Sequence, residues 1–215
     1  MNQPASNPET KQQPPPQLLL EIGKGHATAF ACLLLQNGFF LPNIKVGSSV
    51  REFLSGDLGL TPEYIRDRIQ SLFLDGKPVD DYDAAHIRNG SRLALSSALP
   101  GLVGATLRQG GLLASFRGSI TYRDSGINET GSGTVHVKLF NLIMDELGPS
   151  FLLDGILVKT ADLQRFLQAE SDLLWNCTKI LFNDDTIKVP VLLGNDFLGG
   201  YDLIKFSIRY SAKQG

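Results

Sequence analysis

The pattern of apolar and polar positions predicts a chain of short strands and helices. Between residues 18 and 46, apolar groups are separated by Asn37-Gly38. Both residues of this dipeptide tolerate positive φ, which favours a two-residue hairpin turn. We therefore predict that residues 28–36 and 39–46 form two paired strands.

Two short helices are expected after this hairpin. Ser49 precedes apolar residues at helical spacing, and a serine at that position can cap the first turn. Thr61-Pro62 repeats this arrangement, with threonine as the cap and proline in the first turn.

Strands and tight turns are expected next. Residues 69–74, with the sequence IQSLFL, are expected to form a strand that ends at Asp75-Gly76. Asn89-Gly90 precedes a strand in which Leu93 and Leu95 alternate with polar or small residues. The predicted order is strand, strand, helix, strand, short strand, strand.

This order resembles the β-grasp fold of ubiquitin and of the small sulfur-carrier proteins. The resemblance covers residues 28–98 and is carried by LFLDGKPVDD at 72–81 and HIRNGSRLAL at 86–95. It implies a mixed sheet with one main helix, and a sheet face that binds partners.

A second small α+β part is expected after residue 111. The segments FLLDGILV at 151–158 and LFLDGKPV at 72–79 are alike, so a duplication and a common local turn are both open explanations. The predicted fold class is therefore α+β, with a tail over 1–16, a β-grasp-like domain over 17–111 and an α+β domain over 112–215. In the last of these we predict strands over 112–122, 134–139, 179–182, 186–193 and 204–210, and helices over 141–147 and 160–175.

Composition and charge narrow the classes of function. Hydrophobic residues make up 42% and charged residues 20% of the chain, and the net charge is −2. A nucleic-acid partner is not expected, because no run of Lys and Arg provides a basic surface. A membrane segment is not expected either, because no apolar run approaches the roughly 20 residues that a membrane helix needs.

The N-terminal segment lacks the pattern of a secretory signal, and Cys32 and Cys177 are far apart, so we predict a cytoplasmic protein with reduced thiols.

Motifs for common enzyme chemistry are missing. The sequence contains no Walker-type phosphate loop, dinucleotide-binding glycine motif, nucleophile elbow or HExxH zinc motif. We therefore predict no cofactor and no metal. The acidic residues Asp80, Asp81 and Asp83, with His86, remain a candidate site for a hard cation or a general base, and solvated turn carboxylates are the alternative.

Three functions stay open from the sequence. The first is a non-enzymatic protein-interaction module, which a protein partner or a second copy of the chain would contact. The second is a small enzyme with a site between the two parts, using Asp80, Asp81, His86 or His136. The third is a sulfur-carrier-like protein activated by cleavage after Gly111. For the first function, the candidate interface residues are Leu93, Leu95, Leu99, Leu102, Val103 and Leu107.

Overall fold

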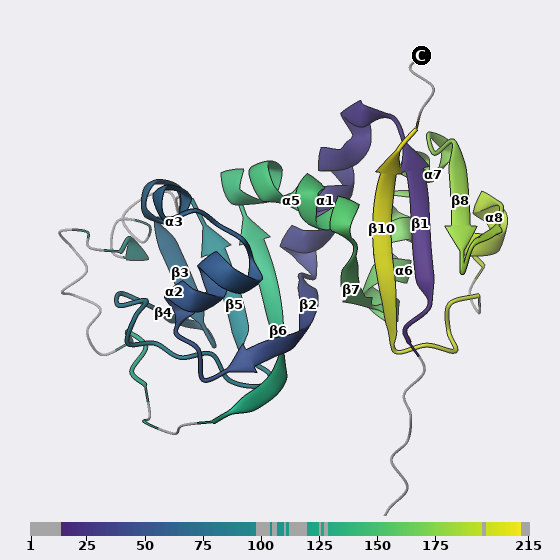
Figure 1. Cartoon of the computed structure of the whole chain (residues 1–215). Coiled ribbons are helices and arrows are strands. Elements are labelled where there is room, and N and C mark those ends of the chain that lie inside the picture. The colour runs from purple at the N-terminus through teal and green to yellow at the C-terminus, as the bar shows by residue number, and fades with distance from the viewer. Residues whose placement is uncertain are drawn as a thin grey trace, which may run out of the picture.

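The structure is a computed structural model that describes residues 14–97, 104, 107–109, 111, 120–124, 126, 129–194 and 197–211. These residues form an α+β protein with one mixed sheet of ten strands, in the order β4-β3-β5-β6-β2-β7-β10-β1-β8-β9 (Figure 1). The strands are β1 (Gln17–Ile22), β2 (Phe39–Val46), β3 (Ser71–Leu74), β4 (Lys77–Pro78), β5 (Arg92–Ser96), β6 (Gly131–Phe140), β7 (Ile156–Lys159), β8 (Lys179–Phe182), β9 (Asp185–Thr186) and β10 (Leu203–Tyr210).

Helices connect these strands. The helical elements are the 3₁₀ turn η1 (Lys24–His26), α1 (Ala27–Gln36), α2 (Val50–Glu52), the π-helical turn η2 (Phe53–Asp57), α3 (Pro62–Arg68), α5 (Leu142–Asp154), α6 (Thr160–Ala169), α7 (Ser171–Trp175) and α8 (Val189–Leu192). The α+β class expected from the sequence is thereby confirmed.

The sheet consists of two halves with the same pattern of strand directions. In the first half, β2 is antiparallel to β6, β6 is parallel to β5, and β5 and β4 are each antiparallel to β3. The second half repeats this pattern. There, β7 is antiparallel to β10, β10 is parallel to β1, and β1 and β9 are each antiparallel to β8. In both halves, short helices follow the strand at the junction and precede, along the chain, the fourth strand of that half. In the first half α2 and α3 come between β2 and β3, and in the second half α6 and α7 come between β7 and β8.

These halves differ from the sequence ranges expected as domains, because strand pairing crosses residues 111 and 112. β1 lies between β10 and β8 in the second half, although it is the first strand of the chain. β6 lies between β5 and β2 in the first half. The predicted 1–16 tail lies outside the described residues except for Pro14–Pro16.

The predicted hairpin of residues 28–36 and 39–46 is wrong in its first strand. Residues 27–36 form α1, and β2 pairs instead with β6. Asn37 has a negative φ, whereas Gly38 has a φ of 74°, and both amides bond to the Leu33 carbonyl. Asn37-Gly38 therefore ends a helix with a left-handed glycine rather than forming a two-residue hairpin turn.

Two predicted helices and one predicted strand also have different bounds. α5 does not end at Gly148-Pro149 but continues through Pro149 to Asp154, where Gly155 has a φ of 87°. The helix predicted over 160–175 is divided into α6 and α7. The strand predicted over 186–193 ends early, because α8 forms from residue 189. The similar segments at 72–79 and 151–158 are not equivalent, since the first is a hairpin and the second runs from α5 into β7.

Several local predictions are confirmed. The Ser49 hydroxyl accepts the Glu52 amide, and the Glu52 carboxylate accepts the Ser49 amide, which forms a capping box. Thr61 caps α3 through the Tyr64 amide. Asp75 and Gly76 both have positive φ, as a type I′ turn requires.

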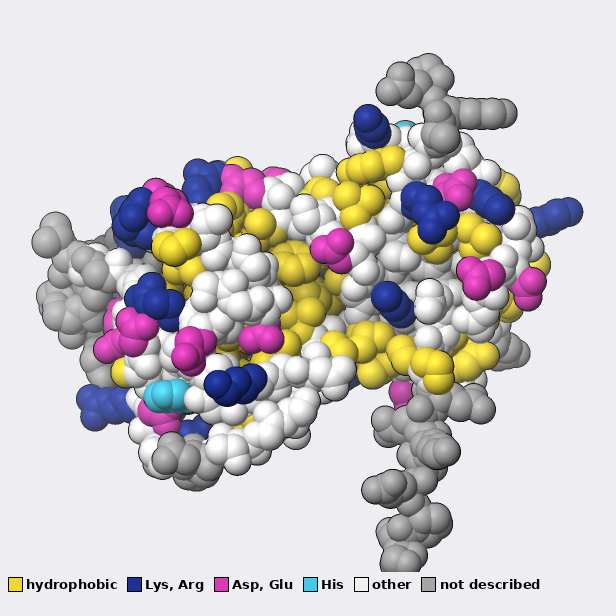
Figure 2. Space-filling view, in the orientation of Figure 1, with side chains coloured by type: hydrophobic (Ala, Val, Ile, Leu, Met, Phe, Trp, Pro, Cys, Tyr) yellow, Lys and Arg dark blue, Asp and Glu magenta, His cyan; other side chains and the backbone are white. Residues whose placement is uncertain are grey.

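The two halves share one hydrophobic core, in which α1 and α5 lie side by side between them (Figure 1). Phe30 of α1 contacts Phe206 of β10, and Phe39 of β2 contacts Phe151 of α5 at a ring distance of 5.0 Å. Figure 2 shows hydrophobic side chains gathered along the junction between the halves. Packing of both halves against the same two helices holds them together.

Candidate functional site

The open face of the first half carries aromatic and basic side chains in ordered rows. Phe73, Ala94 and Lys138 lie opposite one another on β3, β5 and β6. Neighbouring residues of each strand point to the helix-covered face and are buried, whereas these three are half-buried. The small side chain of Ala94 therefore lies between two long ones.

A hollow of about 640 Å³ lies over this row. Its volume is within the range typical of ligand sites, about 300–1,000 Å³. Residues from both halves contribute, since Asp162 is in the first turn of α6. The hollow is lined by Asn37, Phe73, Gly76, Arg92, Leu93, Ala94, Ser96, His136, Lys138, Phe140 and Asp162.

A second row crosses the junction of the two halves. Arg92 lies opposite His136, and His136 lies opposite Phe40. Phe40 is in turn opposite Leu157, which lies opposite Lys205. This face is thus continuous from the first half into the second.

The ring of His136 is fixed by two contacts, and its protonated form is disfavoured in the folded protein. Its Nε2–H donates to the Asn37 carbonyl at 2.8 Å, and its ring lies 4.7 Å from that of Phe40. Burial lowers the pKa of His136, as do the charges of Lys138, Lys159 and Arg92, although the bond to Asn37 opposes this. The neutral imidazole is therefore the form that the folded protein prefers.

Two of the leucines proposed from the sequence as interface residues, Leu93 and Leu95, do not point to this open face. Leu93 and Leu95 are 2% and 0% exposed, because alternate residues of β5 point into the core. Leu107 is half-buried, and its carbonyl accepts the Ser71 hydroxyl. Leu99, Leu102 and Val103 lie outside the described residues.

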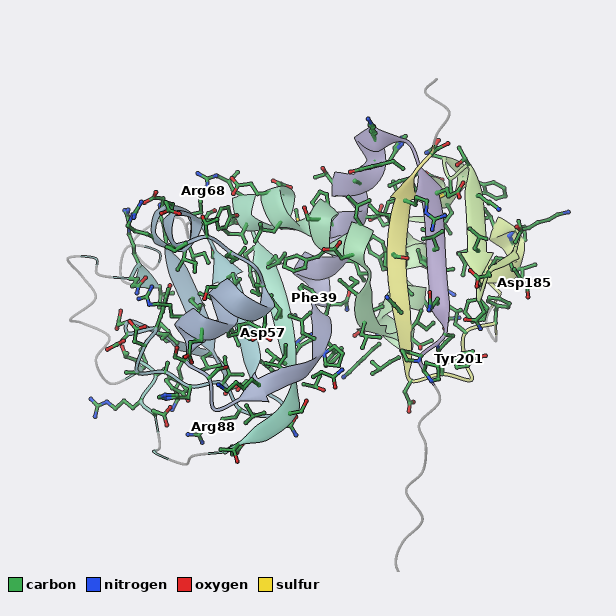
Figure 3. All side chains as sticks on the ribbon, in the orientation of Figure 1. Phe39, Asp57, Arg68, Arg88, Asp185 and Tyr201 are labelled. Carbon is green, nitrogen blue, oxygen red and sulfur yellow. The ribbon has the colours of Figure 1, made fainter. Side chains whose placement is uncertain are left out.

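His86 belongs to a second polar cluster, in which its partner is Asp124. Its Nδ1 lies 2.9 Å from Asp124 Oδ2, and Arg88 donates to Oδ1 of the same carboxylate. The amides of His86 and Gly126 also donate to Asp124. Burial alone would raise the pKa of Asp124, but these donors outweigh it and the pKa is lowered. Figure 3 shows Arg88 in the first half, far from Asp185 and Tyr201 of the second.

The acidic residues predicted beside His86 have other partners. Asp83 forms an exposed ion pair with Arg51. Asp81 accepts the amides of Asp83 and Ala84, as a turn carboxylate does. Asp80 and Asp81 line a hollow of about 220 Å³ together with Asp124, whereas His86 lines a neighbouring one.

Candidate reactive groups also include the possible metal ligands and the two cysteines, Cys32 and Cys177, of the described part of the chain. Its His, Cys, Asp and Glu side chains form no group of three that could hold a metal ion. Neither cysteine is in a disulfide, and burial raises the pKa of Cys177 to about 11, so its thiol is protonated at neutral pH. Gly110, one side of the Gly110-Gly111 pair at the proposed cleavage site, lies outside the described residues.

The sequence carries a signal for the open face in the side chains at alternate strand positions. Phe73, Ala94 and Lys138 occupy the non-core positions of predicted strands, where a phenylalanine is unusual in a solvent-facing row. Their proximity depends on β6 pairing with β5, which the local pattern does not specify. The role of Asp124 was likewise not predicted.

Comparison with known proteins gave no relative, since no protein family, curated protein or solved structure matches the chain. Among the described residues, no helix combines the length and the apolar character needed to cross a bilayer.

Proposed function

We propose that this chain is a protein-interaction module built from two β-grasp-like units, and that it binds a protein partner over the hollow at Ala94. This hollow, with phenylalanines and basic residues on an open sheet face, is the observation that carries the proposal.

The arrangement of strands supports the β-grasp part of the proposal. Each half has a parallel central pair, antiparallel strands on both sides, and helices that connect the junction strand to the fourth strand of the half. A β-grasp unit needs the same mixed sheet. In each half, the strand antiparallel to the junction strand comes later in the chain, β6 in the first half and β10 in the second, so each unit would be a permuted form of the fold.

The chemistry of the open face supports docking. The core-facing leucines and valines of β5 and β6 are buried, whereas Phe73, Ala94 and Phe140 are partly accessible around the hollow. Accessible aromatic side chains beside cations are typical of the centres of protein interfaces, where aromatic residues and arginine are enriched. A partner that covers them would remove apolar area from water.

Selection from a random 12-residue peptide library displayed on phage tests this function. The immobilised full chain is the target, and Ala94→Trp is the counter-target, because an indole at position 94 would fill the hollow from its floor. We expect selected peptides to bind the wild-type chain at least tenfold more tightly than Ala94→Trp. Circular dichroism and the melting temperature establish whether the variant is folded.

Two further variants keep the test decisive. Ala94→Ser leaves the hollow open and should keep full binding. Trp175→Ala changes a 65% exposed tryptophan of α7 in the second half and should also keep it. Peptides whose affinity depends on Trp175 and not on Ala94 would show that the protein docks through another surface, and the proposal would be wrong.

A further inference from the structure

The charges around the hollow at Ala94 are mostly positive. Arg92 and Lys138 line it, and Lys159 is near enough to act on His136. One acidic side chain, Asp162, is among the lining residues of the described chain, and it forms an ion pair with Arg165. The surface therefore favours a partner with the opposite charge.

The floor of the hollow is apolar. Phe73 and Ala94 lie opposite each other on β3 and β5, and Phe140 lies opposite Ser96 two residues further along β5. Ala94 leaves a gap between these larger side chains. A bulky apolar side chain that enters the gap would contact both phenylalanines, and each such burial contributes about 25 cal/mol for every Å² removed from water.

We propose that the partner presents an acidic segment with a bulky apolar anchor, in which the anchor occupies the hollow and flanking carboxylates contact Arg92 and Lys138. This inference rests on the proposed function and specifies the class of partner. A bidentate carboxylate pairing suits the guanidinium of Arg92, whereas the Lys138 ammonium provides a point charge.

His136 favours the same class of partner. Its neutral ring is fixed by Asn37 and Phe40, so it adds an apolar surface between Arg92 and the second half. Carboxylates that approach the open face offset the repulsion that Lys138, Lys159 and Arg92 exert on its protonated form. Binding is therefore expected to raise the pKa of His136, which NMR of its ring protons can follow.

The sequences of the selected phage peptides provide the first test. We expect the Ala94-dependent peptides to contain more Asp and Glu than the unselected library, placed on one or both sides of a Phe, Leu, Trp or Met. The best peptide is then synthesised with its acidic residues changed to Lys, and separately with its anchor changed to Ser. Each change should weaken binding at least tenfold, and affinity for the original peptide should fall as salt rises from about 50 to 500 mM.

Charge reversal on the protein provides the second test. The double variant Arg92→Glu with Lys138→Glu should bind the acidic peptide at least tenfold more weakly than the wild-type chain does. It should bind the lysine variant of the peptide more tightly. Lys24→Glu with Lys188→Glu makes the same change of net charge at two exposed sites that do not line the hollow, and should leave binding unchanged.

The outcomes separate this inference from the proposed function. Ala94-dependent peptides that are uncharged or basic, with affinity insensitive to salt, would overturn the acidic partner and leave docking at the hollow in place. Failure to obtain any Ala94-dependent peptide would overturn both. Tighter, Ala94-dependent binding of a single-stranded oligonucleotide such as a uridine 12-mer would assign the basic and aromatic face to nucleic acid instead.

Discussion

Phe40 of β2 lies directly opposite Leu157 of β7, at the place where the two halves of the sheet meet. On the same face, Phe40 is also opposite His136 and Leu157 is opposite Lys205. The strands at this junction come from residues that are more than a hundred positions apart. Long-range pairing therefore creates both the continuous sheet and the open face.

The position of β1 predicts that the second half depends on the N-terminal strand. A chain lacking residues 1–24 should not fold stably, because β1 supplies the strand between β10 and β8. A peptide of residues 14–24 added in trans should restore the far-ultraviolet circular dichroism of the folded chain.

Two altered peptides make this experiment specific. Leu18→Asp places a charge at a fully buried position and should abolish the rescue. Leu19→Lys changes the neighbouring, half-buried position on the other face and should still rescue. Equal restoration of the folded spectrum by the two peptides would contradict the burial of Leu18 and the accessibility of Leu19 in β1.

Neighbouring residues of β5 are expected to differ sharply in their effect on stability. Leu93→Ala removes a side chain that is 2% exposed and should lower the free energy of unfolding by about 2–5 kcal/mol. Ala94→Ser, on the open face, should change it by less than about 1 kcal/mol. Urea unfolding followed by far-ultraviolet circular dichroism measures both. A similar loss in the two variants would be inconsistent with the observed faces of the strand.

Asp124 is expected to stabilise the fold by holding the segment around it against His86 and Arg88. Asp124→Ala removes the acceptor of several N–H groups and should cost about 1–2 kcal/mol near neutral pH. Because the folded pKa of Asp124 is lowered, its contribution is present above its unfolded pKa of about 3.9 and is lost as pH falls through the folded value.

Urea titrations at several pH values check this prediction. The difference between wild type and Asp124→Ala should be largest near pH 7 and should shrink below about pH 4. Asp83→Ala removes an exposed carboxylate paired with Arg51 and should have little effect on stability. A difference that persists unchanged at low pH would show that the Asp124 charge is not responsible.

His136 should make the protein less stable as pH falls. Its pKa is lowered in the folded state, so below its unfolded value of about 6.5 the unfolded chain binds the proton more readily. Stability is therefore lost between pH 6.5 and the folded pKa. His136→Gln cannot titrate and should show a smaller loss between pH 7.5 and 5 in urea unfolding, and an equal loss would rule out this histidine as the source.

The sequence by itself determined the elements whose signals are local. The caps at Ser49 and Thr61, the Asp75-Gly76 turn and the alternating strand that became β10 depend on residues within one or two turns of each other. Such features form through local backbone preferences and side-chain bonds, so a short window of sequence is sufficient to predict them.

Tertiary structure decided the rest, because the same local signal is compatible with more than one long-range arrangement. Asn37-Gly38 can end a helix or form a hairpin, and packing of Ala27, Phe30 and Ala31 into the shared core favours the helix. One neighbour of β5 in the sheet is β6, which begins about forty residues further along the chain, so the sequence around β5 does not specify this pairing. The hollow at Ala94 and the cluster at Asp124 exist only once these distant segments meet, and that meeting is determined by burial of the whole core rather than by any local pattern.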